Sequence, residues 1–277
     1  MQMKTIIFFI LLAIFSFSNS FAQNDIEKWV EKSFDCIEKE NYVCAEEALK
    51  EALRLSPASS KNGFLLANLG NIQLTLGKKD DALLSFHAAI ALLPDNLTLY
   101  LSRATLYAEM DSISLALDDY NTVIKKDPED EDALYAAGLI YIQRNDTLLA
   151  QEYFDKIIAE NPHSIKGKVG HGMLNKASGN YQTAEIIFSE VLVQNPQYYF
   201  VYIQRAVVYL KLHKNAKALD DVNQYIQKYP DDEYAYFLRG QVKLQQWEKL
   251  SAYEDFLKAK SLGYDTEAVA AMIRQCK

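Results

Sequence analysis

Histidines and cysteines are the residues of this chain whose chemistry most often supports metal binding or catalysis. The four histidines lie in different parts of the chain, and none belongs to a His-Glu-x-x-His pattern or to a paired-ligand spacing. His171 stands alone beside Gly172, and a histidine without partners favours a structural role over a catalytic one. These four residues, which predict no metal site, are His87, His163, His171 and His213.

Acidic and basic residues recur at multiples of 34 residues, but they form no recognisable catalytic set. The chain has no Gly-x-Ser-x-Gly elbow and no glycine-rich phosphate loop. The recurrence favours ion pairs between neighbouring repeats or a solvated face, and binding of a carboxylate by the arginines stays open as an alternative. We therefore predict no enzyme and no cofactor. The recurring residues are Asp118-Asp119, Asp220-Asp221 and Glu254-Asp255, with Arg103, Arg205 and Arg239.

Residues 1–22 have the organisation of a signal peptide. Lys4 precedes an apolar run from Ile6 to Phe15, and Ser20-Phe21-Ala22 places small residues where signal peptidase requires them. The run is shorter than the roughly 20 residues of a membrane-spanning helix. The sequence predicts cleavage after Ala22, a periplasmic or secreted mature chain, and no stable membrane insertion.

Two of the three cysteines lie close together in the sequence, and disulfides can form outside the cytoplasm. Cys36 and Cys44 could form a bridge if their Cα atoms lie within roughly 7 Å of each other, and Cys276 would then stay unpaired. The formal charge of −8 disfavours nucleic acid as a partner, because phosphates would be repelled.

A period of 34 residues organises the chain. Prolines recur at this interval, and Pro57 precedes the first of them by 37 residues. The prolines are Pro94, Pro128, Pro162, Pro196 and Pro230. In the same register stand an alanine column (Ala45, Ala82, Ala116, Ala150, Ala184, Ala218, Ala252), a small-residue column (Ser33, Gly70, Ala104, Gly138, Gly172, Ala206, Gly240) and a bulky column (Leu49, Phe86, Tyr120, Phe154, Phe188, Val222, Phe256). Small columns let two helices approach closely, and bulky residues fill the space between repeats.

Each period contains two helical stretches. Ala82, Phe86 and Ala89 follow a helical spacing, turn residues such as Ser178-Gly179-Asn180 interrupt it, and the trailing proline ends the second stretch. This pattern resembles the tetratricopeptide repeat, and the resemblance covers residues 26–264. It implies an all-α, right-handed superhelical solenoid of seven helical hairpins. We expect one continuous array over 23–264, with hairpins at 26–59, 63–96, 97–130, 131–164, 165–198, 199–232 and 233–264, and a capping helix at 265–277.

The resemblance also implies a binding surface, because the family usually holds peptides on a concave wall made by the first helices of its hairpins. Carrying the family's columns onto this chain gives partner-binding residues that are mainly apolar, which suits an amphipathic helix or an extended apolar segment. The expected residues are Val30, Phe34, Asn68, Asn71, Leu101, Tyr135, Leu139, Val169, Met173, Ile203, Val207 and Phe237. Some of these side chains could instead pack against neighbouring repeats.

Two further features remain open. Lys166, Lys168 and Lys176 form a local basic cluster that could contact an acidic partner or lie on a solvated face. Asp111-Ser112-Ile113 and Asp146-Thr147-Leu148 resemble acceptor sites of periplasmic O-glycosylation, although the same residues are also common helix N-caps.

The sequence therefore favours a non-enzymatic scaffold or adaptor that binds a protein or peptide outside the cytoplasm. An accessory protein of an envelope or glycan-handling complex, with a small-molecule or weak catalytic site in its groove, is the alternative. A purely structural spacer is a third reading. The sequence specifies neither the partner nor the oligomeric state.

Overall fold

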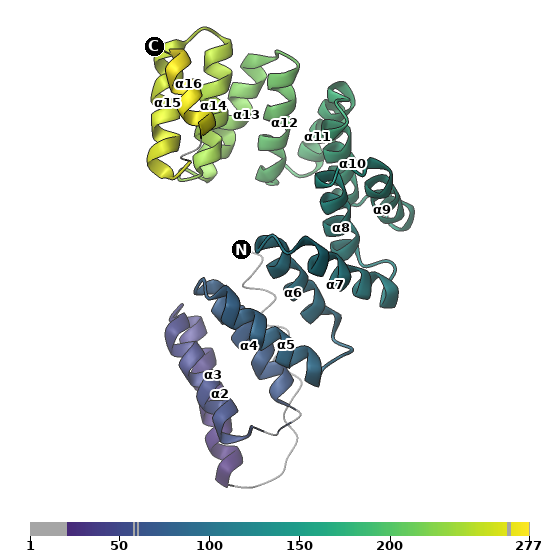
Figure 1. Cartoon of the computed structure of the whole chain (residues 1–277), viewed down its shortest axis with the longest axis vertical. Helices are drawn as coiled ribbons and strands as arrows, with labels where there is room; N and C mark the ends of the chain where they lie inside the picture. Colours follow the sequence, from purple (N-terminus) through teal and green to yellow (C-terminus); the bar gives the residue numbers. More distant parts are fainter. Residues whose placement is uncertain (1–20, 58, 60, 265–266, 277) are drawn as a thin grey trace. The chain divides into compact units, whose positions relative to one another are not determined.

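The computed structural model describes residues 21–57, 59, 61–264 and 267–276, and within them the chain is all-α, as expected (Figure 1). The helices are α2 (Phe21–Glu38), α3 (Tyr42–Leu55), α4 (Asn62–Thr75), α5 (Lys79–Leu92), α6 (Leu97–Glu109), α7 (Ile113–Lys126), α8 (Glu131–Gln143), α9 (Thr147–Glu160), α10 (Ile165–Ala177), α11 (Tyr181–Gln194), α12 (Tyr199–Lys211), α13 (Asn215–Lys228), α14 (Glu233–Gln245), α15 (Lys249–Leu262) and α16 (Glu267–Cys276). No described helix combines the length and the hydropathy needed to cross a membrane. The predicted signal peptide lies outside the described residues except for Phe21 and Ala22, which begin α2.

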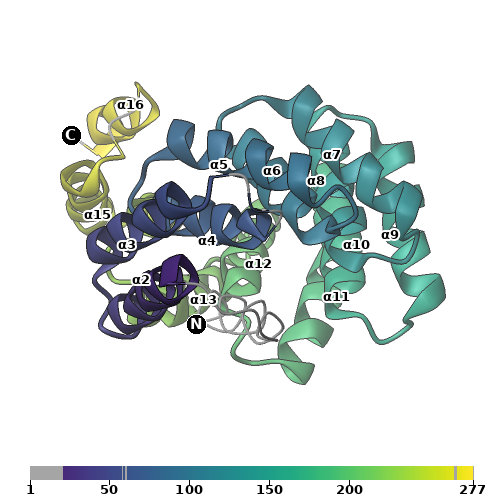
Figure 2. The ribbon, with the colours of Figure 1, turned by 90° about the horizontal axis from the view of Figure 1, so that it is seen from below.

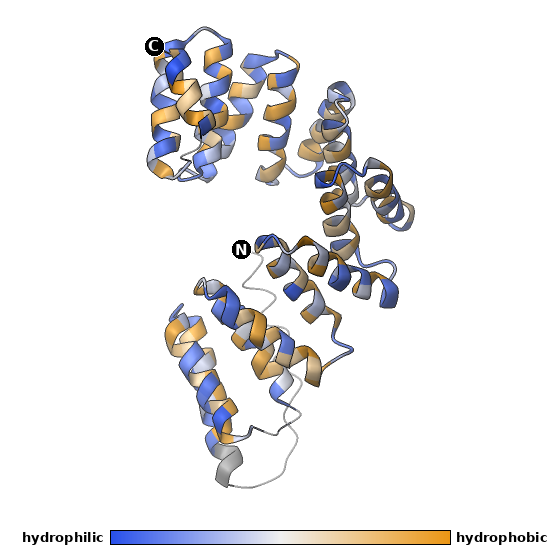
Figure 3. Cartoon of the chain, viewed as in Figure 1, coloured by the Kyte–Doolittle hydropathy of each residue, from blue (hydrophilic) through white to orange (hydrophobic). Residues whose placement is uncertain are grey.

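Among the described residues, consecutive helices pair into seven helical hairpins, from α2–α3 to α14–α15, and α16 follows them. Apolar and polar residues alternate along the helices, which Figure 3 shows as orange and blue segments of the ribbons. The last helix, α16, lies beside α15 in Figures 1 and 2 and covers the end of the array. Its Val269 is buried, and Ile273 and Cys276 pack on the core around Phe256.

The chain divides into two compact halves, residues 1–128 and 129–277, which we call the N-terminal half and the C-terminal half. The continuous array over 23–264 that the sequence led us to expect stays a prediction. In a repeat array each hairpin contacts mainly its sequence neighbours, so a regular period alone does not make all the hairpins one compact body.

Each hairpin is held together by a small residue on its first helix and a bulky one on its second. A Cβ atom built on Gly172 would lie 2.4 Å from Cε1 of Phe188, and one on Gly138 would lie 2.5 Å from Cε1 of Phe154. Both phenylalanines are fully buried. Since no side chain fits in these gaps, the close approach of the two helices depends on glycine.

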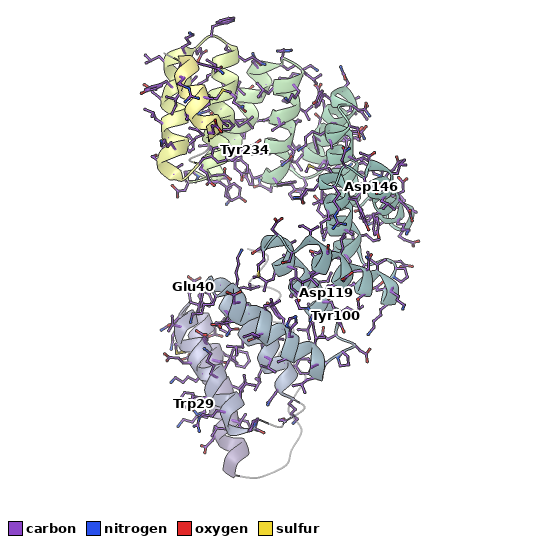
Figure 4. All side chains as sticks on the ribbon, in the orientation of Figure 1. Trp29, Glu40, Tyr100, Asp119, Asp146 and Tyr234 are labelled. Carbon is purple, nitrogen blue, oxygen red and sulfur yellow. A yellow bond between two sulfur atoms is a disulfide. The ribbon has the colours of Figure 1, made fainter. Side chains whose placement is uncertain are left out.

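The turn inside every hairpin contains one residue with positive φ, always at the same position of the repeat. Two of these residues are Gly77 and Gly179, whereas the others carry side chains: Glu40, Asp111, Asn145, His213 and Trp247. Figure 4 labels Glu40 and Asp146, which lie at the turns of α2–α3 and α8–α9. A left-handed backbone conformation is unfavourable for an L-residue by about 1 kcal/mol. The packing of the two helices therefore holds the turn in this conformation even where the residue is not glycine.

We predict that Trp247→Gly stabilises the protein by about 1 kcal/mol relative to Trp247→Ala, because glycine adopts positive φ without steric strain. The φ of Trp247 is 66°, and its side chain is 85% exposed, so removing the indole loses little packing. Urea unfolding of the two variants measures the difference. Equal midpoints would mean that the turn relaxes to another conformation.

Candidate functional site

The recurring arginines and acids form buried ion pairs inside single hairpins. Arg103 donates from Nε and Nη2 to the two carboxylate oxygens of Asp119, both at 2.8 Å, and Figure 4 labels Asp119 on α7. Arg205 and Asp221 make the same paired contact at 2.8 Å. This corrects the expectation of exposed pairs between repeats, because the partners lie 16 residues apart within one hairpin and the acids are buried.

The third pair, in the last hairpin, includes a second cation. Arg239 donates to Asp255 at 2.9 and 2.7 Å, and Nζ of Lys243 lies 2.8 Å from the same carboxylate. The adjacent acids of the recurring doublets, such as Glu254, are exposed. The second acid of each doublet therefore pairs with the arginine of its own hairpin.

A further contact links these arginines to the preceding repeat. Nη1 of Arg205 donates to Oγ of Ser189, and Nη1 of Arg239 donates to Oδ1 of Asn223. His171 occupies the arginine position of its own hairpin, and its Nε2 lies 3.2 Å from Asp155 of the hairpin before. The predicted structural role of His171 thus has a physical basis, since it replaces an arginine in the contact between repeats.

The other histidines are not brought together. His87 lies 2.8 Å from the hydroxyl of Tyr107, and burial together with the charge of Arg103 lowers its pKa. Among the described residues, no group of histidines, cysteines and acids is arranged to hold a metal ion.

The first hairpin carries a disulfide. Cys36 on α2 and Cys44 on α3 are bonded, and their Cα atoms lie 5.8 Å apart. The bond spans the turn at Glu40 and joins the two helices of the terminal hairpin. It therefore cross-links the two helices of the first described hairpin.

We predict that Cys36→Ser together with Cys44→Ser destabilises the first hairpin by about 2.5 kcal/mol, the loop-closure value for a cross-link over eight residues. Hydrogen exchange of α2 and α3 in the oxidised wild type and in the double variant measures the loss. Unchanged protection of α2 and α3 would contradict a stabilising role for the bond. Cys276→Ser, at the other end of the chain, serves as the matched control.

In the C-terminal half, the expected partner-binding residues separate into two groups by burial. Val169, Ile203 and Phe237 are buried, and Phe237 packs between Phe256 and Tyr264. Their assignment as partner contacts stays a prediction, and in the structure these buried side chains fill the space between hairpins. A ligand could reach them only by opening the core.

The remaining residues of this half are partly exposed. We call the surface formed by Tyr135, Leu139, Met173, Val207 and Gln241 on α8, α10, α12 and α14 the first-helix face. Tyr135 and Met173 pack by one side on the same core cluster, and burial raises the pKa of Tyr135. Four of the five side chains are apolar or aromatic, so this face offers an apolar surface to a partner.

An open hollow of about 480 Å³ continues the first-helix face toward the C-terminus. It lies between α12, α14 and α16 and includes Gln241. Leucines and a methionine supply its apolar part, and lysine, glutamine and histidine side chains form its border. The lining residues are Leu210, Lys211, His213, Gln241, Leu244, Gln245 and Met272.

In the N-terminal half, Val30, Phe34, Asn71 and Leu101 are partly exposed on α2, α4 and α6. Asn68 is buried, and its Oδ1 has no hydrogen-bond partner. An unsatisfied buried carbonyl oxygen is unfavourable by about 1–3 kcal/mol, and the burial of Asn68 places its side chain inside the hairpin packing and not on an exposed binding surface.

Sequence reasoning missed a set of apolar side chains on the second helices. The most exposed of them are Val193, Leu148, Leu250 and Leu84, followed by Ile186. Open hollows on α9 and α11 are lined by Leu148, Ile186 and Val193. A helical period marks which residues share a face but not how much of that face a neighbour covers. Those on α9 and α11 are exposed apolar side chains that any binding experiment must separate from the first-helix face.

The structure also shows the contacts of the three clustered lysines and the positions of the two motifs that resemble glycosylation sites. Lys166 pairs with Asp132, whereas Lys168 and Lys176 donate to the amide oxygens of Gln194 and Gln204, so the three lysines do not act as one patch. Asp146 caps α9 by accepting from the amide of Leu149. Ser112 occupies the N-cap position of α7 without a capping hydrogen bond, and Thr147 is the first residue of α9.

Comparisons with known proteins agree with this architecture. The family model of the tetratricopeptide repeat matches residues 101–165. A tetratricopeptide repeat protein from Parabacteroides merdae ATCC 43184 is 39% identical in sequence, and the match covers 91% of this chain and 99% of that one with a TM-score of 0.80. The chain belongs to the tetratricopeptide repeat family.

More distant tetratricopeptide-type structures share the fold. PilW, a type IV pilus biogenesis factor, is 17% identical with a TM-score of 0.64 over 76% of this chain and 98% of its own. The APC/C hetero-tetramer Cut9–Hcn1 is 14% identical with a TM-score of 0.70, over 90% of this chain and 55% of that one. At these identities the similarity concerns the fold alone.

Proposed function

We propose that this tetratricopeptide repeat protein is a non-enzymatic scaffold that binds a segment of another protein on the first-helix face of its C-terminal half. Membership of the family supports a role in protein interaction. The observation that carries the choice of surface is the open hollow between α12, α14 and α16. Its mixed apolar and polar lining includes Gln241, which belongs to the same partly exposed column as Met173 and Val207.

The chemistry of this surface suits a peptide. Its apolar side chains can bury apolar side chains of a partner, which supplies most of the affinity, and its glutamine and lysine border can hydrogen-bond the partner backbone. The hollow lacks the enclosed shape and the convergent catalytic groups that a small substrate requires.

The proposed compartment is the periplasm or the exterior of the cell. The charged start, apolar run and small residues of residues 1–22 support export. The Cys36–Cys44 disulfide supports it independently, because thiols are kept reduced in the cytosol.

The test compares two double variants of the mature chain in affinity capture from its native envelope. Leu139→Ser with Val207→Ser makes the first-helix face polar, whereas Ile186→Ser with Val193→Ser makes the same chemical change on α11. We expect the first double variant to lose the bound partner and the second to retain it, with both keeping wild-type helicity.

The opposite pattern would move the site to the second helices. If neither double variant lost a partner, the first-helix face would not be the binding surface. A copurifying small molecule or detectable turnover would favour the accessory-protein alternative.

A further inference from the structure

Lys176 is an exception within an otherwise apolar column of the array. The residue at its position of the repeat is apolar in the six other hairpins, including Leu210 and Leu244 of the hollow. The remaining four residues are Ile37, Leu74, Ala108 and Ile142. A charged side chain has therefore replaced a packing residue at this one point of the first helices.

The contacts of Lys176 do not neutralise its charge. Its Nζ donates to the amide oxygen of Gln204 on α12, and no described carboxylate lies within ion-pair distance. Burial lowers the pKa of Lys176, and no acidic neighbour opposes the effect. An ammonium that is half-buried without a counter-ion destabilises the fold, because water no longer solvates it fully.

Other described lysines show that this arrangement is avoidable. Lys166, on the same helix, reaches Asp132 of the preceding hairpin, and Lys214 reaches Glu185. Lys78 lies 2.6 Å from Glu46. Lysines at the contacts between hairpins usually have an acid to pair with, whereas Lys176 has an amide.

The surroundings of Lys176 belong to the first-helix face. Met173 precedes it by one turn on α10, and Val207 follows Gln204 by one turn on α12. Side chains three residues apart on a helix lie on the same side, so the Lys176–Gln204 hydrogen bond is bordered by two apolar groups. The Lys176 ammonium therefore lies beside the apolar side chains of Met173 and Val207 and keeps N–H donors for a further acceptor.

We propose that Lys176, positioned by Gln204, binds a carboxylate of the partner, so that the partner segment carries an acidic residue between apolar residues. This inference rests on the proposed function, because it names the chemistry recognised on the same face. The ammonium has three donors, of which the Gln204 amide uses one, and a carboxylate would both accept from the others and neutralise the charge.

The test selects random twelve-residue peptides displayed on phage against the mature full-length protein. Three proteins are compared: wild type, Lys176→Met and Lys168→Met. The last is a matched control, because Lys168 lies on the same helix and also donates to a glutamine, Gln194. Methionine keeps the length and apolar stem of lysine without its charge.

We expect wild type and Lys168→Met to enrich peptides with Asp or Glu between apolar residues, and Lys176→Met to enrich apolar peptides without this acidic preference. For one selected peptide, replacing its Glu by Gln should weaken binding to wild type about tenfold or more and leave binding to Lys176→Met unchanged.

Apolar peptides without an acidic preference on wild type would overturn the inference and leave the proposed function standing. An acidic preference that survives in Lys176→Met would also overturn it. If wild type enriched no sequence above background, the proposed function would fail, and this inference with it.

Thermal unfolding supplies a second readout. Lys176→Met should raise Tm by about 2–4 °C, because it removes a half-buried charge without a counter-ion. An unchanged or lower Tm would contradict the premise of the inference, which is that the Lys176 ammonium has no counter-ion.

Discussion

Asp255→Ala is expected to destabilise the C-terminal half by about 3 kcal/mol. The substitution removes the carboxylate shared by Arg239 and Lys243, whose nitrogens lie 2.7 to 2.9 Å from it. Removing one partner of a buried ion pair leaves uncompensated charge, and here two cations would also repel each other. Urea unfolding followed by far-ultraviolet circular dichroism measures the change.

Glu254→Ala is the matched control for this prediction. Glu254 precedes Asp255 on α15 but is exposed, so its removal should change the free energy of unfolding by less than about 0.5 kcal/mol. Similar losses for the two variants would mean that general charge balance matters, not the buried contact within the hairpin.

Gly172→Leu is expected to destabilise the protein by about 3 kcal/mol or to prevent the fifth hairpin from closing. The Cβ atom alone would lie 2.4 Å from Cε1 of Phe188 and 2.8 Å from its Cδ1, and the phenylalanine is fully buried among its neighbours. Overpacking a filled core forces rotamers and backbone to shift. Thermal unfolding and hydrogen exchange of α10 and α11 measure the effect.

Ala177→Leu tests whether the effect comes from the position and not from the larger residue. Ala177 lies on the same helix but is exposed, so the substitution should leave Tm within about 1 °C of wild type. A stable Gly172→Leu variant would show that α10 and α11 can separate, which contradicts the close crossing described above.

The fold followed from the sequence because its signals repeat. One proline, one alanine or one glycine is ambiguous, but the same residue types at a 34-residue interval agree on one hairpin register seven times. The positions with positive φ show the limit of such signals. Trp247 and Glu40 occupy the same turn position as Gly77, so residue type alone does not identify it.

The site was less predictable than the fold, because the position of a residue in the repeat indicates on which side of its helix it lies but not how deeply its side chain is buried. Tyr135 and Val169 occupy the same position of successive repeats, yet the first is partly exposed and the second is buried. Depth depends on how closely the neighbouring hairpin packs, which no single repeat encodes.

The ion pairs illustrate the same limit. Recurrence at 34 residues linked Arg205 to an acid but did not distinguish a partner in its own hairpin from one in the next. The exposed apolar residues of the second helices gave only a partial periodic signal, because Leu148 and Leu250 share one position of the repeat but Gln182 and Ala216 occupy it in the hairpins between them. The lone lysine at position 176 was visible in the sequence, but its lack of an acidic partner required the structure.

Site-specific photo-crosslinking tests the central proposal most directly. A photoreactive phenylalanine analogue is placed at Val207 on the first-helix face or at Val193 on α11, and each protein is irradiated in its native envelope. The proposal predicts a discrete crosslinked protein partner from the first position and none, or a diffuse background, from the second. A discrete partner from the second position alone would contradict it.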